Sequence, residues 1–102
     1  MPKRVCVSTR DLFFRAKLAA VAQAAGAEIA DEDAPCDVAV VELGAADSAA
    51  RVRTLVGRGI AVLAFGAHVR PEELRAAREA GAVAVPNSQV EERLRELLGR
   101  RK

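Results

Sequence analysis

The sequence predicts an α/β domain with about four helices around a small parallel sheet of five strands, and two observations carry this prediction. Short runs rich in β-branched residues alternate with longer segments of helical periodicity, which is typical of βαβ units with right-handed crossovers. In addition, the run over 38–43 is almost continuously apolar, as expected for a strand buried on both faces of a parallel sheet.

The length and composition favour one folded domain over residues 1–102. A chain of 102 residues matches the usual length of a single domain. Apolar residues make up 51% and charged residues 29%, which is typical of globular rather than disordered chains. Because the chain has three Phe and no Trp or Tyr, its core must be aliphatic, with a large share of alanine.

Turn residues and apolar spacing place the expected elements. Ser8 stands three residues before Asp11, and Ser88 three residues before Glu91, which is the spacing of a helix capping box. Pro71 suits the first position of a helix. We expect strands over 5–7, 27–29, 38–43, 60–65 and 82–85, and helices over 11–25, 47–56, 71–80 and from Ser88 onward.

Each amphipathic helix should direct one apolar stripe toward the sheet. The residues expected to face the core are Phe14, Leu18, Val21 and Ala25 in the first helix, Ala49, Val52, Leu55 and Val56 in the second, and Val90, Leu94, Leu97 and Leu98 in the last.

One connection is too short to hold a helix. Only about eight residues, with an acidic turn and Pro35, separate the second and third strands, whereas a parallel crossover normally needs about ten or more. We therefore expect one face of the sheet to be partly bare, and we expect a partner to cover that bare patch.

Charge and cysteine usage exclude several classes of protein. The net charge is +2, and the only basic run, 100–102, lies at the C-terminus, so nucleic-acid binding is not favoured. No stretch is long enough for a signal peptide or a membrane span. We therefore expect a cytoplasmic protein with reduced thiols, in which Cys6 and Cys36 are small buried hydrophobic residues.

Three stretches together resemble the receiver domains of bacterial response regulators. Residues 36–43 look like the strand that presents the phosphorylated aspartate, 60–67 like the next strand and its switch loop, and 79–85 like the passage into the last strand. The phrase Phe65-Gly66-Ala67-His68-Val69 is similar to one in small receiver-like proteins that lack the phosphorylation site. The resemblance implies a flavodoxin-like sheet of order 2-1-3-4-5.

The positions that match the family's phosphorylation site carry other residue types. Ser8, Thr9 and Arg10 stand where the resemblance implies an acidic pair for Mg²⁺, and Glu42 stands where it implies the nucleophilic aspartate. The sensing hydroxyl falls near Gly66 and the lysine around Asn87. The sequence therefore predicts no phosphotransfer, because near-attack geometry does not tolerate a displaced carboxylate, and no metal site or cofactor.

Glu42 has two interpretations. It could be a fixed mimic of the phosphorylated state, although it carries about one negative charge against roughly two for a phosphoryl group. The simpler interpretation, which we favour, is a carboxylate at a strand end that meets solvent and pairs with Arg10. His68 is the only histidine and is expected to be a loop residue with local contacts, since one imidazole is not a metal site.

Two further functions remain open at the carboxyl edge of the sheet, where ligands bind in open α/β folds. One is binding of a small anion or nucleotide at a helix N-terminus, although no glycine-rich phosphate loop follows the first strand. The other is an enzyme with a Ser or Cys nucleophile, which lacks a nucleophile elbow here. The candidate ligand residues at this edge are Ser8, Thr9, Arg10, Glu42, Gly66, His68, Asn87 and Ser88.

We favour a non-catalytic role in protein interaction over both alternatives. The resemblance implies pairing through the last two helices and the last strand, with a protein partner or a second copy of the chain. Mixed charges at helical spacing are compatible with contacts across a two-fold axis. The candidate residues for this face are Arg75, Arg78, Glu79, Glu91 and Arg95.

Overall fold

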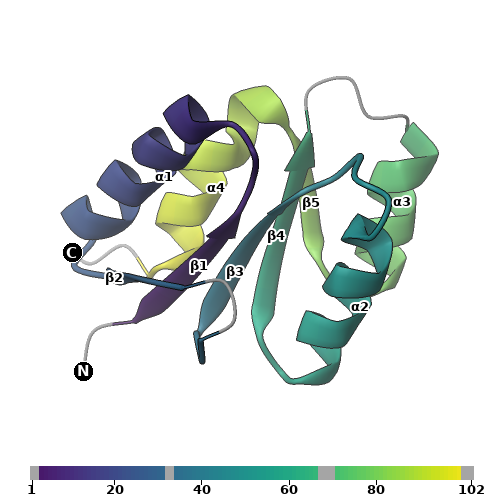
Figure 1. The fold of residues 1–102 in the computed structure, drawn as a ribbon, viewed down its shortest axis with the longest axis horizontal. Helices are drawn as coiled ribbons and strands as arrows, with labels where there is room; N and C mark the ends of the chain where they lie inside the picture. Colours follow the sequence, from purple (N-terminus) through teal and green to yellow (C-terminus); the bar gives the residue numbers. More distant parts are fainter. Residues whose placement is uncertain (1–2, 32–33, 67–70, 100–102) are drawn as a thin grey trace.

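The computed structural model describes residues 3–31, 34–66 and 71–99, and its centre is one parallel five-stranded sheet. The strands lie in the order β2-β1-β3-β4-β5 and every neighbouring pair is parallel (Figure 1). The predicted fold class and strand order are thereby confirmed. The strands are β1 (Arg4–Ser8), β2 (Glu28–Ala30), β3 (Val38–Glu42), β4 (Ala61–Gly66) and β5 (Val83–Pro86).

Four helices cover the two faces of the sheet. α1 (Leu12–Ala24) and α4 (Val90–Leu97) lie on one face, and α2 (Ser48–Gly57) and α3 (Pro71–Glu79) lie on the other (Figure 1). A short 3₁₀ turn, Asn87–Gln89, precedes α4. No helix within the described ranges is long and apolar enough to cross a membrane.

The strand register determines which residues meet at the carboxyl edge of the sheet. Ser8 pairs with Val41, and Glu42 pairs with Phe65 in the next strand. Gly66 ends β4 opposite Pro86 of β5. Because the strands are parallel, their carboxyl ends lie at the same edge, and the loops that follow β1 and β3 meet there.

The two faces of the sheet have cores of different character. Under α1 and α4 the core holds large side chains, among them Leu18, Leu63, Phe65 and Leu94, all with no exposed surface. Phe14 packs edge-on against Phe65, with ring centroids 5.0 Å apart and an interplanar angle of 75°, a favoured geometry for aromatic pairs. Under α2 and α3 the buried residues are smaller and include Ala39, Ala64, Ala77, Ala82 and Ala84.

The expected bare patch on the sheet is not present, because the described part of the connection between β2 and β3, residues 31 and 34–37, lies over it. Cys6, Ala30 and Ala39 face this side and are only 4%, 6% and 2% exposed. The Cys6 thiol donates to the carbonyl of Asp31 at 3.1 Å and to that of Ala34 at 3.6 Å. Ala34 and Cys36 of this connection pack against the same buried residues, so the patch is covered within the chain.

Two predicted helix caps are wrong. Ser8 belongs to β1, and α1 is capped by Asp11, whose carboxylate accepts from the backbone N–H of Phe14 at 3.0 Å. Ser88 lies in the 3₁₀ turn, and the residue that precedes α4 is Gln89, which makes no side-chain cap. The spacing of each motif was present, but the helix began at a different residue, and only the backbone geometry decides that.

The predicted apolar stripes are largely confirmed, with two exceptions. Ala25 follows the end of α1 and is exposed, and Ala22 takes its place in the core. Ala49 is also exposed, whereas Ser48 is buried. The Ser48 hydroxyl donates to the carbonyl of Ala45 at 2.9 Å, so its burial leaves no unpaired donor. Cys36, which was expected to be buried, is half-buried.

Two glycines should respond to alanine in opposite directions. Gly81 has a φ of +109°, and a Cβ there would lie 2.8 Å from Cγ1 of Val56. Gly57 is the last residue of α2, and a Cβ there would meet nothing within 4 Å. We expect G81A to lower the free energy of unfolding by about 1–3 kcal/mol, because an L side chain is strained at this φ. We expect G57A to raise it by about 0.4–1 kcal/mol. Urea unfolding followed by circular dichroism measures both, and equal effects of the two variants would contradict the assigned backbone conformations.

Candidate functional site

An open cleft of about 710 Å³ lies at the carboxyl edge of the sheet, between the loops that follow β1 and β3. It brings together four of the predicted ligand residues, Ser8, Thr9, Arg10 and Glu42. The remaining lining residues are Asp11, Val41, Leu43, Gly44, Ala45, Asp47, Ser48 and Arg51. The sequence did not indicate Asp47 or Arg51, because they come from α2 and the turn before it.

The centre of this cleft is a chain of hydrogen bonds between the two loops. The Thr9 hydroxyl donates to Oε1 of Glu42 at 2.5 Å. The same hydroxyl oxygen accepts from the backbone N–H of Asp11 at 3.1 Å. The predicted pairing of Glu42 with Arg10 is therefore wrong, because Glu42 is bound by Thr9. The bond joins the end of β1 to the end of β3 and includes a charged acceptor, which makes it stronger than a neutral one.

The charges in the cleft are mixed. Asp11, Glu42 and Asp47 contribute three carboxylates, and Arg10 and Arg51 contribute two guanidinium groups. One carboxylate caps α1 and another accepts from Thr9. Three negative charges against two positive charges do not favour a bare anion, and the described residues include no group of three or more His, Cys, Asp or Glu that could hold a metal ion.

The other predicted ligand residues are not part of this cleft. Gly66 is buried at the end of β4, opposite Pro86. Asn87 and Ser88 are exposed in the 3₁₀ turn after β5. His68 falls within 67–70, outside the described residues. At the positions where a receiver domain would have a sensing hydroxyl and a lysine, this chain therefore has Gly66, which has no side chain, and Asn87, which has a neutral amide.

The candidate nucleophiles among the Ser and Cys residues are Cys6, Cys36, Ser8 and Ser88. Burial, together with the neighbouring Cys36 thiol, raises the pKa of the Cys6 thiol to about 12. A thiol that stays protonated is a poor nucleophile. Cys6 donates to backbone carbonyls of the β2–β3 connection, and Cys36 is half-buried. Ser8 is half-buried at the end of β1, and Ser88 is exposed in the 3₁₀ turn.

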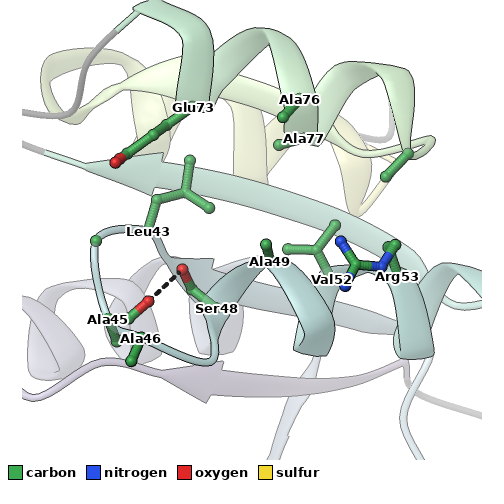
Figure 2. Close-up of a pocket in the computed structure, with 12 residues that line it drawn as sticks. Leu43, Ala45, Ala46, Ser48, Ala49, Val52, Arg53, Glu73, Ala76 and Ala77 are labelled. Carbon is green, nitrogen blue, oxygen red and sulfur yellow. Dashed lines mark hydrogen bonds between the residues drawn. The ribbon is translucent and has the colours of Figure 1, made fainter.

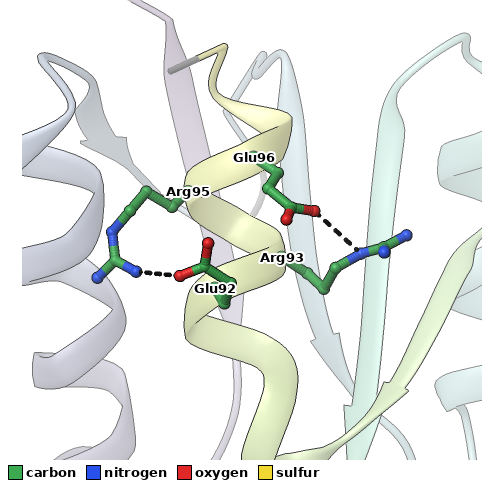
Figure 3. A network of polar contacts seen from close by, with 4 residues as sticks. All are labelled: Glu92, Arg93, Arg95 and Glu96. Atoms are coloured by element: carbon green, nitrogen blue, oxygen red, sulfur yellow. Dashed lines mark hydrogen bonds and ion pairs between the residues drawn. The ribbon is translucent and has the colours of Figure 1, made fainter. Parts of the chain in front are cut away.

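Three of the five residues predicted for the interaction face make contacts within the chain. Arg78 of α3 donates to the carbonyl of Ala84 in β5 at 2.8 and 3.3 Å. Glu91 pairs with Lys17 of α1 at 3.3 Å, and Arg95 pairs with Glu92 at 2.7 Å on α4 (Figure 3). Arg75 and Glu79 are exposed on α3.

A second hollow, which the sequence did not indicate, lies between α2 and α3 (Figure 2). Its volume is about 190 Å³, and half of its twelve lining residues are alanines. The alanine content of both helices was the only signal in the sequence that could have revealed it. Here it is called the α2–α3 groove, and its lining is Leu43, Gly44, Ala45, Ala46, Ser48, Ala49, Val52, Arg53, Glu73, Ala76, Ala77 and Ala80.

Sequence comparison finds no relatives, whereas structural comparison finds many. No protein-family model matches the chain, and no curated protein matches it. Among solved structures, the BeF3-activated receiver domain of DrrB has a TM-score of 0.81 at 18% identity, over 98% of this chain and 97% of that one. The chemotaxis protein CheY4 of Vibrio cholerae has a TM-score of 0.75 at 16% identity, over 98% of each chain.

The longer structure of DrrB, an OmpR/PhoB homolog from Thermotoga maritima, has a TM-score of 0.77 at 16% identity, over 94% of this chain and 50% of that one. The present chain thus spans half the length of that relative. At these identities the similarity shows the fold alone. The chain has the flavodoxin-like fold of CheY-like receiver domains.

The bond between Thr9 and Glu42 should contribute measurably to stability. We expect T9V to lower the free energy of unfolding by about 0.5–1.5 kcal/mol, because it leaves a half-buried carboxylate without its donor. T9S keeps the hydroxyl and serves as the control. A double-mutant cycle with E42A isolates the pair, and a coupling energy close to zero would contradict a formed hydrogen bond.

Proposed function

We propose that this chain is a receiver-like module that is not phosphorylated and acts by binding protein in bacterial signalling or regulation, within the cytoplasm. The observation that carries the proposal is the hydrogen bond from Thr9 to Glu42. Phosphotransfer in a receiver domain would require an acidic pair that holds a metal at the position of Thr9, and a nucleophilic aspartate at the position of Glu42. In this chain the two positions are joined by a hydrogen bond.

The surroundings of Glu42 support the absence of phosphotransfer. A Mg²⁺ ion needs one or two carboxylates together with several waters. Here one oxygen of Glu42 accepts from Thr9, and the first acid after β1, Asp11, caps α1. Gly66 and Asn87 supply neither a hydroxyl nor an amine at the other two positions that the chemistry uses.

A binding role is supported by the surface opposite β2. Among the described residues β5 is the last strand of the sheet, so one of its edges has no neighbouring strand there, and such an edge can pair with another chain. Beside it, α3 exposes Arg75 and Glu79, one turn apart and opposite in charge. Opposite charges arranged in this way can pair across a two-fold axis. We therefore place the contact with a protein partner, or with a second copy, on α3, β5 and α4.

The alternative of an anion, nucleotide or enzymatic substrate at the carboxyl edge has less support. The excess of carboxylates in that cleft repels phosphate groups. The buried Cys6 thiol, with its raised pKa, is not available as a nucleophile.

Incubation with Mg²⁺ and acetyl phosphate should leave the chain unmodified. Intact-mass spectrometry is expected to show no phosphoryl adduct on the wild-type chain under conditions that modify a phosphorylatable receiver domain run in parallel. The variant E42D restores the shorter side chain and should also stay unmodified, because the acidic pair is still missing. An adduct on the wild-type chain would overturn the proposal, and an adduct on E42D alone would show that side-chain length was the only obstacle.

The face formed by α3, β5 and α4 should control association at about 10–100 µM. We expect R75E/E79R to weaken association, with a second copy or with a captured partner, at least tenfold, because both charges are inverted while the net charge is unchanged. The matched control is R58E/E28R, which inverts two exposed charges away from this face. Analytical ultracentrifugation measures the change, and equal effects of the two variants would place the contact elsewhere.

A further inference from the structure

Two large apolar side chains are exposed at the start of α1. Leu12 and Phe13 have 75% and 76% of their surface in contact with solvent, and they are the large exposed hydrophobic residues within the described ranges. They stand next to each other at the first turn of the helix and are called the knob here. Paired exposed hydrophobic residues with charged neighbours are typical of contact surfaces.

The α2–α3 groove is an apolar hollow on the opposite side of the sheet. Leu43 and Val52 form its floor, while Ala49 of α2 and Ala76 of α3 stand on facing walls (Figure 2). Because alanine side chains are short, the two helices leave a hollow of about 190 Å³. An apolar cavity of about 150 Å³ is large enough to bind benzene, so the groove can hold one phenyl ring.

The charges around the knob and the groove are complementary. Glu73 and Arg53 stand at opposite ends of the groove (Figure 2), and neither has an ion-pair partner within the described residues. The knob has Asp11, which caps α1, on one side and Lys17, which pairs with Glu91, on the other, with Lys17 Nζ 5.6 Å from the centre of the Phe13 ring. A knob placed in the groove can thus set Lys17 toward Glu73 and Asp11 toward Arg53.

We propose that a second copy of this chain inserts its Phe13 ring into the α2–α3 groove. Ring size, apolar lining and both pairs of charges are all supplied by the chain itself, which favours a second copy over an unrelated partner. This contact shares α3 with the face proposed above, but it uses Glu73 and Ala76 of that helix in place of Arg75 and Glu79, and it does not depend on that face.

The placement of the two surfaces determines the kind of assembly. α1 lies on one face of the sheet and the groove on the other (Figure 1). One contact therefore leaves a free knob on the first copy and a free groove on the second. Such a heterologous contact does not close as a dimer and continues head to tail.

Sedimentation equilibrium at increasing concentration, up to about 1 mM, tests the proposal. The average mass of the wild-type chain should rise past that of a dimer. F13S removes the ring, and A49L/A76L fills the groove from two exposed helix positions where leucine costs little helix propensity. Each should weaken association at least tenfold. A50L, exposed on α2 outside the groove, is the matched control and should associate like the wild type.

Mixing the two variants gives the decisive result. F13S retains an intact groove and A49L/A76L retains an intact knob, so together they should form a one-to-one complex that neither forms alone. Thermal unfolding of each variant confirms that it is folded. A monomeric wild-type chain, association of A49L/A76L equal to wild type, or a mixture that stays monomeric would each overturn the proposal.

Loss of association in F13S alone would indicate pairing of α1 with α1, and loss only in R75E/E79R would indicate the α3, β5 and α4 face. Either result would also overturn it.

Discussion

The parallel register of β1, β3 and β4 is the constraint on which the rest of this molecule depends. It brings Ser8 beside Val41 and Glu42 beside Phe65, so the loops after β1 and β3 meet at one edge. That meeting places the Thr9 hydroxyl against the Glu42 carboxylate. The same geometry forms a structural hydrogen bond between two strand ends.

The difference in side-chain size between the two faces of the sheet explains two further features. Large side chains such as Leu18, Phe65 and Leu94 fill the space under α1 and α4. On the other face, small residues let the β2–β3 connection lie directly over Cys6. They also leave the α2–α3 groove unfilled between two alanine-rich helices. The same small side chains thus explain both the covered patch over Cys6 and the open α2–α3 groove. Protein interiors are closely packed, so the volume of the side chains at each place decides whether the space is filled.

Some charged side chains hold elements of the chain together, whereas others are exposed and can contact a partner. Arg78 joins α3 to β5, and Glu91 joins α4 to Lys17 of α1. The ion pairs on α4 are internal to that helix and exposed (Figure 3), so each adds little to stability. Arg75 and Glu79 remain exposed on α3, and the apolar knob stands alone on α1. The two proposed contacts use these distinct surfaces.

The sequence by itself determined the fold class, the strands and helices, and most of the core, because apolar periodicity and turn residues act over short distances. It could not decide where a helix begins, and so it assigned caps to Ser8 and Ser88 where the backbone uses Asp11 and Gln89. It also predicted a bare patch that the β2–β3 connection covers, and missed the groove between α2 and α3. The partners of Glu42, Arg78 and Glu91 come from other elements of the chain, and only the packing of those elements sets the distances between their side chains.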